Sequence, residues 1–262
     1  MLREKPVEST EQGLAMPAPQ EWRETMTSYQ EPARETGTGK CRENLRGIRG
    51  YGRCRDRLYF RIISTEGNRG LLEQALHREI LDLSIECYVL MERTEDGMAA
   101  ALVTDSLAGY WGIQAEEIMA QAARNTPKLF PVKTDSVLSL LEKLTGAGKE
   151  RRYTETNGKW ELYIMTNSYG INGFGTVLYP GALQSFADAL GKNLYVLPSS
   201  RHEALLFPED VDVSADDLRS MVREVNRTQV TPEDFLSDSV YYYDRAENEL
   251  RVTGKEDVWV RL

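Results

Sequence analysis

The segment from Leu194 to Phe207 limits the possible folds of this chain more than any other stretch. Two short apolar runs, 194–197 and 204–207, stand on either side of a tight polar connector, Pro198 to Glu203. Short apolar runs bounded by turn residues are typical of buried strands. We therefore expect two strands fixed in one sheet. They would hold the connector rigidly at the sheet's edge, where binding and catalytic side chains are often built.

The rest of the chain continues this pattern of short strands and interspersed helices. Beyond the first two runs, strands or buried extended segments are predicted at 58–63, 81–91, 98–104, 160–166, 240–243 and 250–253, and helices at 68–74, 115–124, 134–144, 180–191 and 214–226. Glu95 to Gly97 is a hairpin signal between two of the strands. Strands grouped with strands, with helices between the groups, favour an α+β fold with mixed or antiparallel sheets and flanking helices.

Local signals place several helix ends. Asn125-Thr126-Pro127 is expected to end the helix 115–124, because proline disfavours helical geometry in the preceding residue. Thr134 is expected to cap the next helix. Ser214-Ala-Asp-Asp217 is a capping box, and a short helical turn is expected at Thr231.

Composition divides the chain into three parts. Residues 1–50 lack periodic apolar positions and are rich in Glu, Arg, Thr, Gly and Pro, so we expect a disordered or aberrant segment. The polar, glycine-containing stretch 145–158 is predicted to join two halves of the body. The sequence thus predicts two similar-sized α+β subdomains, 51–148 and 149–262.

The charge distribution is uneven. The formal net charge is −9, yet nine basic residues stand against three acidic ones between Arg34 and Arg61. A basic arm can bind nucleic acid by neutralising phosphates. This arm has few aromatic residues for base stacking, however, and the body is acidic. We therefore expect a solvated segment and rank nucleic-acid binding last.

Cysteine usage and hydropathy indicate a cytoplasmic protein. The three cysteines, Cys41, Cys54 and Cys87, are odd in number and far apart, which favours free thiols, with Cys87 buried in a strand. No apolar run approaches the roughly 20 residues of a membrane span, and the N-terminal stretch lacks the apolar core of a secretory signal. We expect no membrane association.

Four partial motifs lack residues that their chemistry requires. Gly37–Lys40 lacks the first glycine and the final hydroxyl residue of a phosphate-binding loop, and Gly170–Gly175 lacks the third glycine of a dinucleotide fingerprint. His202-Glu203 lacks the second histidine of a zinc-protease helix, and His77–Glu79 lacks the cysteine pair of a zinc deaminase. We expect no cofactor and no metal.

The remaining candidates for chemistry lie in the connector. Ser199 or Ser200 near His202 and Glu203 could form a hydrolase-like site, although near-adjacent residues rarely present a serine and a histidine to each other in catalytic geometry. The leading hypothesis is a binding or interaction module without catalytic activity, with an unknown protein or small molecule as partner. A concave pocket around His202 would favour the enzyme.

The run Tyr241–Tyr243 could be a binding surface, but more simply predicts a strand with Tyr242 on one face and its neighbours on the other.

Several phrases between Tyr51 and Tyr243 together resemble a bacterial family of unknown function (DUF5688-like) from gut Gram-positive bacteria. The phrases are Arg61-Ile-Ile, Asn68-Arg-Gly-Leu-Leu72, His77, Leu81-Asp-Leu83, Trp111-Gly-Ile113, Glu116-Glu117, Ala123-Arg-Asn-Thr-Pro127, Met165-Thr-Asn167, Leu197-Pro-Ser-Ser200, His202-Glu203, Met221-Val222, Glu224-Val-Asn226 and Leu236-Ser-Asp-Ser-Val-Tyr241. The resemblance implies an intracellular α+β protein and supplies no activity. Two departures are Leu76, where the family usually has proline, and residues 1–50, where the family's N-terminal region is not recognisable.

Overall fold

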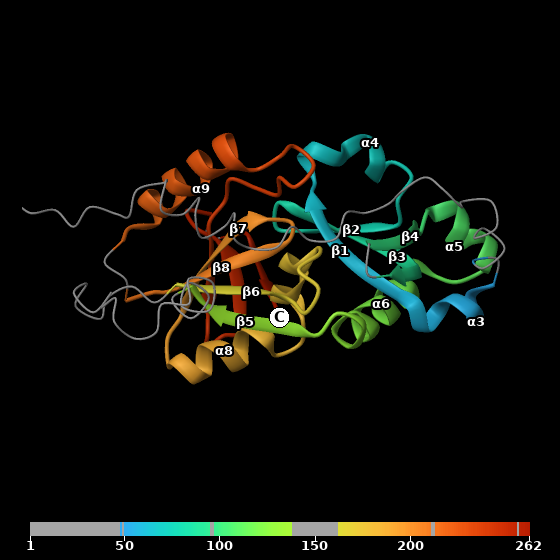
Figure 1. The fold of residues 1–262 in the computed structure, drawn as a ribbon, viewed down its shortest axis with the longest axis horizontal. Coiled ribbons are helices and arrows are strands. Elements are labelled where there is room, and N and C mark those ends of the chain that lie inside the picture. The colour runs from blue at the N-terminus through green and yellow to red at the C-terminus, as the bar shows by residue number, and fades with distance from the viewer. Residues whose placement is uncertain (1–47, 49, 95–96, 138–161, 211–212, 256) are drawn as a thin grey trace, which may run out of the picture. The chain divides into compact units, whose positions relative to one another are not determined.

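The computed structural model describes residues 48, 50–94, 97–137, 162–210, 213–255 and 257–262 (Figure 1). The predicted disorder of 1–50 therefore concerns residues outside the described ranges, apart from Ile48 and Gly50. The predicted joint at 145–158 lies wholly outside them.

The first sheet is built around one long strand. Its strands are β1 (Leu58–Ser64), β2 (His77–Ile80), β3 (Leu83–Thr94) and β4 (Gly97–Leu102). β3 pairs antiparallel with all three other strands. β2 pairs with residues 83–86 of β3, and β4 pairs with residues 88–94. The predicted hairpin is confirmed, because Thr94 pairs with Gly97 across residues 95–96. β2 was not predicted.

The second sheet has seven strands in the order β11-β10-β9-β7-β8-β6-β5, all antiparallel. The strands are β5 (Val132–Ser136), β6 (Tyr163–Asn167), β7 (Leu194–Ser200), β8 (Glu203–Pro208), β9 (Tyr241–Asp244), β10 (Glu249–Val252) and β11 (Trp259–Arg261). The predicted strands 194–197, 204–207, 240–243 and 250–253 are confirmed, and they pair in sequence order as the two hairpins β7–β8 and β9–β10. With the first sheet, this confirms the α+β class.

Thr134 does not cap a helix. It lies in β5, where it pairs with Met165 of β6. Threonine is common both at helix N-caps and in strands, and here pairing with a partner distant in sequence decides between the two. Residues 138–144 of the predicted helix lie outside the described ranges.

The helical segments connect and cover the sheets. They are α3 (Tyr51–Cys54), η2 (Arg55–Arg57), η3 (Glu66–Asn68), α4 (Arg69–Leu72), α5 (Asp105–Trp111), α6 (Ala115–Leu129), η4 (Gly173–Leu178), α8 (Ala182–Leu190) and α9 (Ala215–Gln229). The predicted cap of α9 is confirmed, because the Ser214 hydroxyl accepts a hydrogen bond from the Asp217 amide at 3.1 Å.

The predicted end of α6 at Asn125–Pro127 is wrong, because the helix continues through Pro127 to Leu129. Buried hydrogen bonds hold the residues before the proline in helical geometry. The Asn125 amide donates to the carbonyl of Leu58 at 3.0 Å, and the Thr126 hydroxyl accepts from the amide of Phe60 at 3.0 Å. These contacts to β1 outweigh the local preference of a residue that precedes proline.

The two sheets share one apolar core. Phe60 and Ile62 of β1 belong to the same cluster as Met165, Val196 and Leu206 of the second sheet. β5 precedes the predicted subdomain boundary and yet forms an edge of the second sheet.

Arg61 is an exception to the predicted solvated basic arm. Its side chain is buried in β1, and its guanidinium lies over the ring of Tyr88 at 3.9 Å from the centroid. A guanidinium can be stabilised in this way by the electron-rich face of an aromatic ring.

The opposite face of the second sheet is covered in part by α9. Side chains alternate along β7, so Tyr195 and Leu197 face away from the core residues Leu194 and Val196. α9 lies against β7 (Figure 1) and buries Leu218 and Val222. Tyr195 remains half-buried beside the start of this helix, and this is the face that carries a cavity.

Candidate functional site

The connector predicted as a site is the turn between β7 and β8. Ser200 pairs with Glu203, and a register shift between Pro198 and Ser200 distorts β7 just before the turn. The four predicted residues, Ser199, Ser200, His202 and Glu203, therefore lie within one tight hairpin end. Their side chains divide into two separate groups.

The first group surrounds the His202 ring, whose side chain is 18% exposed. Nδ1 accepts a hydrogen bond from the backbone amide of Asn172 at 3.2 Å, and Nε2 lies 3.1 Å from Oδ1 of Asp234. Because an amide can only donate to Nδ1, the neutral ring carries its proton on Nε2 and donates it to Asp234. Arg201 adds an ion pair to the same carboxylate at 2.9 Å.

The backbone beneath His202 is equally constrained. The Thr166 hydroxyl donates to the His202 carbonyl at 2.7 Å, and the Phe174 amide donates to the Arg201 carbonyl at 3.2 Å. A Cβ at Gly173 would overlap both the Thr166 hydroxyl and the His202 carbonyl. Glycine at 173 therefore permits close approach to the β7–β8 turn.

The second group is a buried pair. The Ser199 hydroxyl donates to Oε1 of Glu203 at 3.3 Å. Burial raises the pKa of Glu203 to about 7, although the Ser199 hydrogen bond opposes the shift. Ser200 is used differently, because its hydroxyl accepts from the His202 amide at 3.0 Å. Both ring nitrogens of His202 and both hydroxyls thus have partners inside the protein, and the hydrolase hypothesis stays a prediction.

The second sheet carries a site that sequence reasoning did not assemble. A cavity of about 440 Å³ that is open to the surface is lined by residues of β7, β9 and β10, the two residues after β10, the residue after β8 and the first residue of α9. The described lining residues are Tyr195, Glu209, Ala215, Tyr242, Arg251, Val252, Thr253 and Gly254. We call it the Tyr242 cavity. None of the four predicted site residues is among its described lining.

Cross-strand register explains how this lining comes together. Tyr195 of β7 pairs with Tyr242 of β9, Tyr242 pairs with Arg251 of β10, and Arg251 pairs with Trp259 of β11. Paired residues project from the same face of a sheet. Three aromatic side chains and one guanidinium therefore form a row across four strands. Tyr241 and Tyr243 are buried on the other face, as predicted.

Contacts within this row fix the rings. Tyr195 and Tyr242 meet edge to face, with centroids 5.5 Å apart, and the Arg251 guanidinium lies 4.7 Å from the centroid of Tyr242. The Tyr242 hydroxyl accepts from Asn193 at 2.7 Å and donates to Oε2 of Glu209 at 2.5 Å. Burial, reinforced by Glu209, raises the pKa of Tyr242 to about 12, so this hydroxyl stays protonated.

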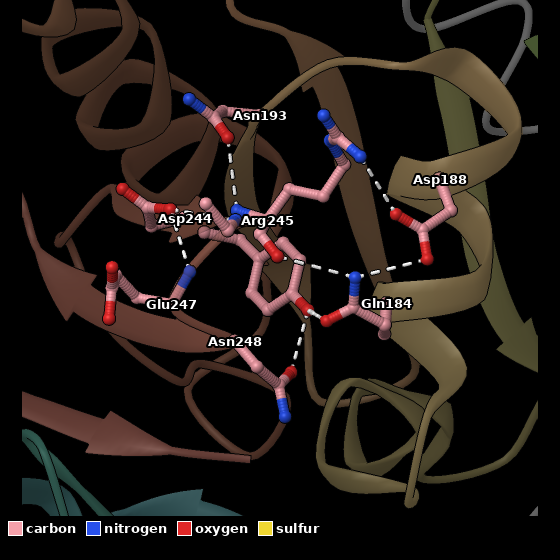
Figure 2. A network of polar contacts seen from close by, with 9 residues as sticks. Gln184, Asp188, Asn193, Asp244, Arg245, Glu247 and Asn248 are labelled. Atoms are coloured by element: carbon pink, nitrogen blue, oxygen red, sulfur yellow. Dashed lines mark hydrogen bonds and ion pairs between the residues drawn. The ribbon is translucent and has the colours of Figure 1, made fainter.

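Asn193, which donates to the Tyr242 hydroxyl, belongs to a polar network (Figure 2). Its side-chain oxygen accepts from the Arg245 amide at 3.0 Å. Arg245 in turn forms an ion pair with Asp188 at 3.1 Å, and Gln184 donates to the Arg245 carbonyl at 3.3 Å. The β9–β10 turn is thereby tied to α8 and to Asn193, the residue before β7, which supports the position of Tyr242.

Within the described residues, no three His, Cys, Asp or Glu side chains come close enough to hold a metal ion. Cys87 lies buried in β3, as predicted, and burial, with Glu86 nearby, raises its pKa to about 12. In the part of the chain that the structure describes, no helix combines the length and apolar character needed to cross a membrane.

The fold is that of an α+β protein with two antiparallel sheets on a shared core. Residues 20–245 match the model of a family of unknown function (DUF5688), and the chain belongs to that family. The match extends the resemblance from residue 51 back to residue 20. No curated protein and no solved structure matches the chain.

Proposed function

We propose that this chain is a binding module without chemistry of its own, and that the Tyr242 cavity is its ligand site. We place it in the bacterial cytoplasm, where a buried thiol such as Cys87 stays reduced.

The observation behind this proposal is that the guanidinium of Arg251 has hydrogen-bond donors that no described residue uses. Its guanidinium lines the cavity and stacks on Tyr242, but no hydrogen bond or ion pair joins it to any described residue. Stacking uses the face of a guanidinium and leaves the five N–H donors in its plane. An arginine held by an aromatic ring in a cavity, with its donors unused, is suited to a ligand.

The His202 cluster supports the same choice. An imidazole that acts as general base needs a ring nitrogen directed at a nucleophile. In the β7–β8 turn, Nδ1 receives the Asn172 amide and Nε2 faces Asp234. The arrangement suits a rigid support for the hairpin, and no specific observation favours the hydrolase.

A thermal-shift screen tests the proposal. The full chain is heated with small carboxylates, amines, amino acids, sugars and nucleotides, in parallel with Arg251→Gln and with the control Arg261→Gln, which alters an exposed arginine on β11. We expect at least one class to raise Tm for the wild type and the control but not for Arg251→Gln. Identical responses of all three proteins, or ester hydrolysis that His202→Ala abolishes, would contradict the proposal.

A further inference from the structure

The described lining of the Tyr242 cavity contains one group of each charge. Arg251 is contributed by β10, and Glu209 follows the end of β8, on the opposite side of β9 and β7 in the sheet order. The two aromatic side chains between them in that order are Tyr242 and Tyr195. The cavity is therefore bipolar, with a cation towards one side, an anion towards the other and aromatic surface between them.

Neither charged group neutralises the other. No ion pair joins Arg251 to Glu209 or to any other described carboxylate, and Oε2 of Glu209 accepts only the Tyr242 hydroxyl. A carboxylate has two oxygens and can accept several hydrogen bonds. Glu209 therefore retains acceptor capacity for a ligand ammonium, while Arg251 offers paired donors that fit a ligand carboxylate.

The charge pattern selects against other anions. A phosphate carries a charge of about −1.5 to −2 near neutral pH and is usually bound by several cationic or amide donors. Arg251 is the only cation in the described lining, and Glu209 would repel a second negative charge. A ligand with one negative and one positive charge matches both groups.

The aromatic surface and the volume define the rest of the ligand. Tyr195 and Tyr242 meet edge to face, and Trp259, which is 53% exposed, stands next to Arg251 on the neighbouring strand. Rings prefer such offset or edge contacts with a further ring. A volume of about 440 Å³ is at the small end of the range for ligand sites, and it suits one ring with a short charged group.

We propose that the Tyr242 cavity binds a free amino acid with an aromatic side chain. Its carboxylate pairs with Arg251, its ammonium pairs with Glu209, and its ring lies against Tyr195 and Tyr242. This inference rests on the proposed function, since it names the ligand class of the same site.

The test is calorimetric titration of the full chain with three matched probes. L-phenylalanine carries both charges, 3-phenylpropionate only the carboxylate and 2-phenylethylamine only the ammonium. We expect phenylalanine to bind at least tenfold more tightly than either single-charge probe. Arg251→Gln should remove the advantage of phenylalanine over phenylethylamine, and Glu209→Gln its advantage over phenylpropionate. Arg261→Gln should bind as the wild type does. Circular dichroism confirms that each variant is folded.

The outcomes separate the two proposals. Equal affinities for the three probes, or affinities unchanged in both cavity variants, would overturn the amino-acid assignment. If another class from the thermal-shift screen binds in an Arg251-dependent way while phenylalanine does not, the assignment is wrong and the binding function stands. If no class depends on Arg251, both proposals fail.

Discussion

At the residue scale, Glu203 makes the stability of the β7–β8 hairpin depend on pH. A carboxyl whose pKa is raised from 4.5 to about 7 keeps its proton in the folded state after the unfolded chain has lost it. Its stabilising contribution is therefore fully present below pH 4.5 and is lost as pH rises through 7. A rise of the pKa from 4.5 to about 7 corresponds to a loss on the order of 3 kcal/mol.

Replacing Glu203 with glutamine should remove this pH dependence. Glutamine keeps an acceptor for the Ser199 hydroxyl and cannot ionise. We expect the variant to match the wild type near pH 5 and to exceed its free energy of unfolding by about 2–3 kcal/mol near pH 8. Urea titrations at both pH values measure this, with Glu224→Gln on the exposed side of α9 as control. A wild-type pH profile retained in Glu203→Gln would show that folding does not raise the pKa of Glu203.

His202→Ala tests whether the imidazole is a support or a site. The substitution leaves the Asn172 amide and the Asp234 carboxylate without their ring partner, which should cost roughly 1–3 kcal/mol. The denaturant midpoint measures the loss, and Asp234→Asn, which retains Oδ1, should cost less. If His202→Ala leaves the denaturant midpoint unchanged and abolishes an ester hydrolysis that the wild type performs, the hydrolase hypothesis is favoured instead.

At the element scale, local sequence predicts buried strands well and exposed strands poorly. The strands of β7–β8, β9–β10 and β3–β4 were found because they carry buried apolar residues. β2, β5 and β11 were not found, because each is short and mostly exposed and therefore lacks an apolar pattern. The Tyr242 cavity was missed as well, because the sequence does not give the pairing of strands. Its row Tyr195, Tyr242, Arg251 and Trp259 depends on strand order and register.

The continuation of α6 past its predicted end is testable at Asn125. Its amide donates to the carbonyls of Arg55 at 2.6 Å and Leu58 at 3.0 Å. Asn125→Ala removes both donated hydrogen bonds and leaves the Gln121 amide without its Asn125 acceptor, so we expect a loss of about 2–3 kcal/mol in the free energy of unfolding. Urea unfolding measures it, with Glu116→Ala, an exposed change in the same helix, as control. A loss below 0.5 kcal/mol, on the order of an ordinary surface substitution, would contradict this account of α6.

At the scale of the whole molecule, Asp82 joins the two sheets. It lies in the β2–β3 turn, and its carboxylate accepts from three hydroxyls of the segment leading into β9: Ser237 at 2.6 Å, Ser239 at 2.8 Å and Tyr241 at 2.7 Å. Asp82 and its three hydroxyl partners all lie in sequence segments that carry the resemblance to the family. The sequence could supply those segments, but not their contact across more than 150 residues.

Asp82→Ala should destabilise both sheets together. It leaves the fully buried Tyr241 hydroxyl and two serines without their acceptor, at a cost of about 3 kcal/mol. Hydrogen exchange of β3 and β7 amides in urea measures this, and we expect the protection of both strands to fall in parallel, with Asp82→Asn affected less. Loss of protection in one strand alone would instead indicate independent subdomains.

The central claim is that the ligand site is the Tyr242 cavity and not the β7–β8 turn. A crystal structure of the full chain soaked with a mixture of small aromatic acids, amines and amino acids tests it most directly. The account predicts a bound molecule between Arg251 and Glu209, in contact with Tyr242. A bound molecule at His202, with the Tyr242 cavity empty, would contradict it.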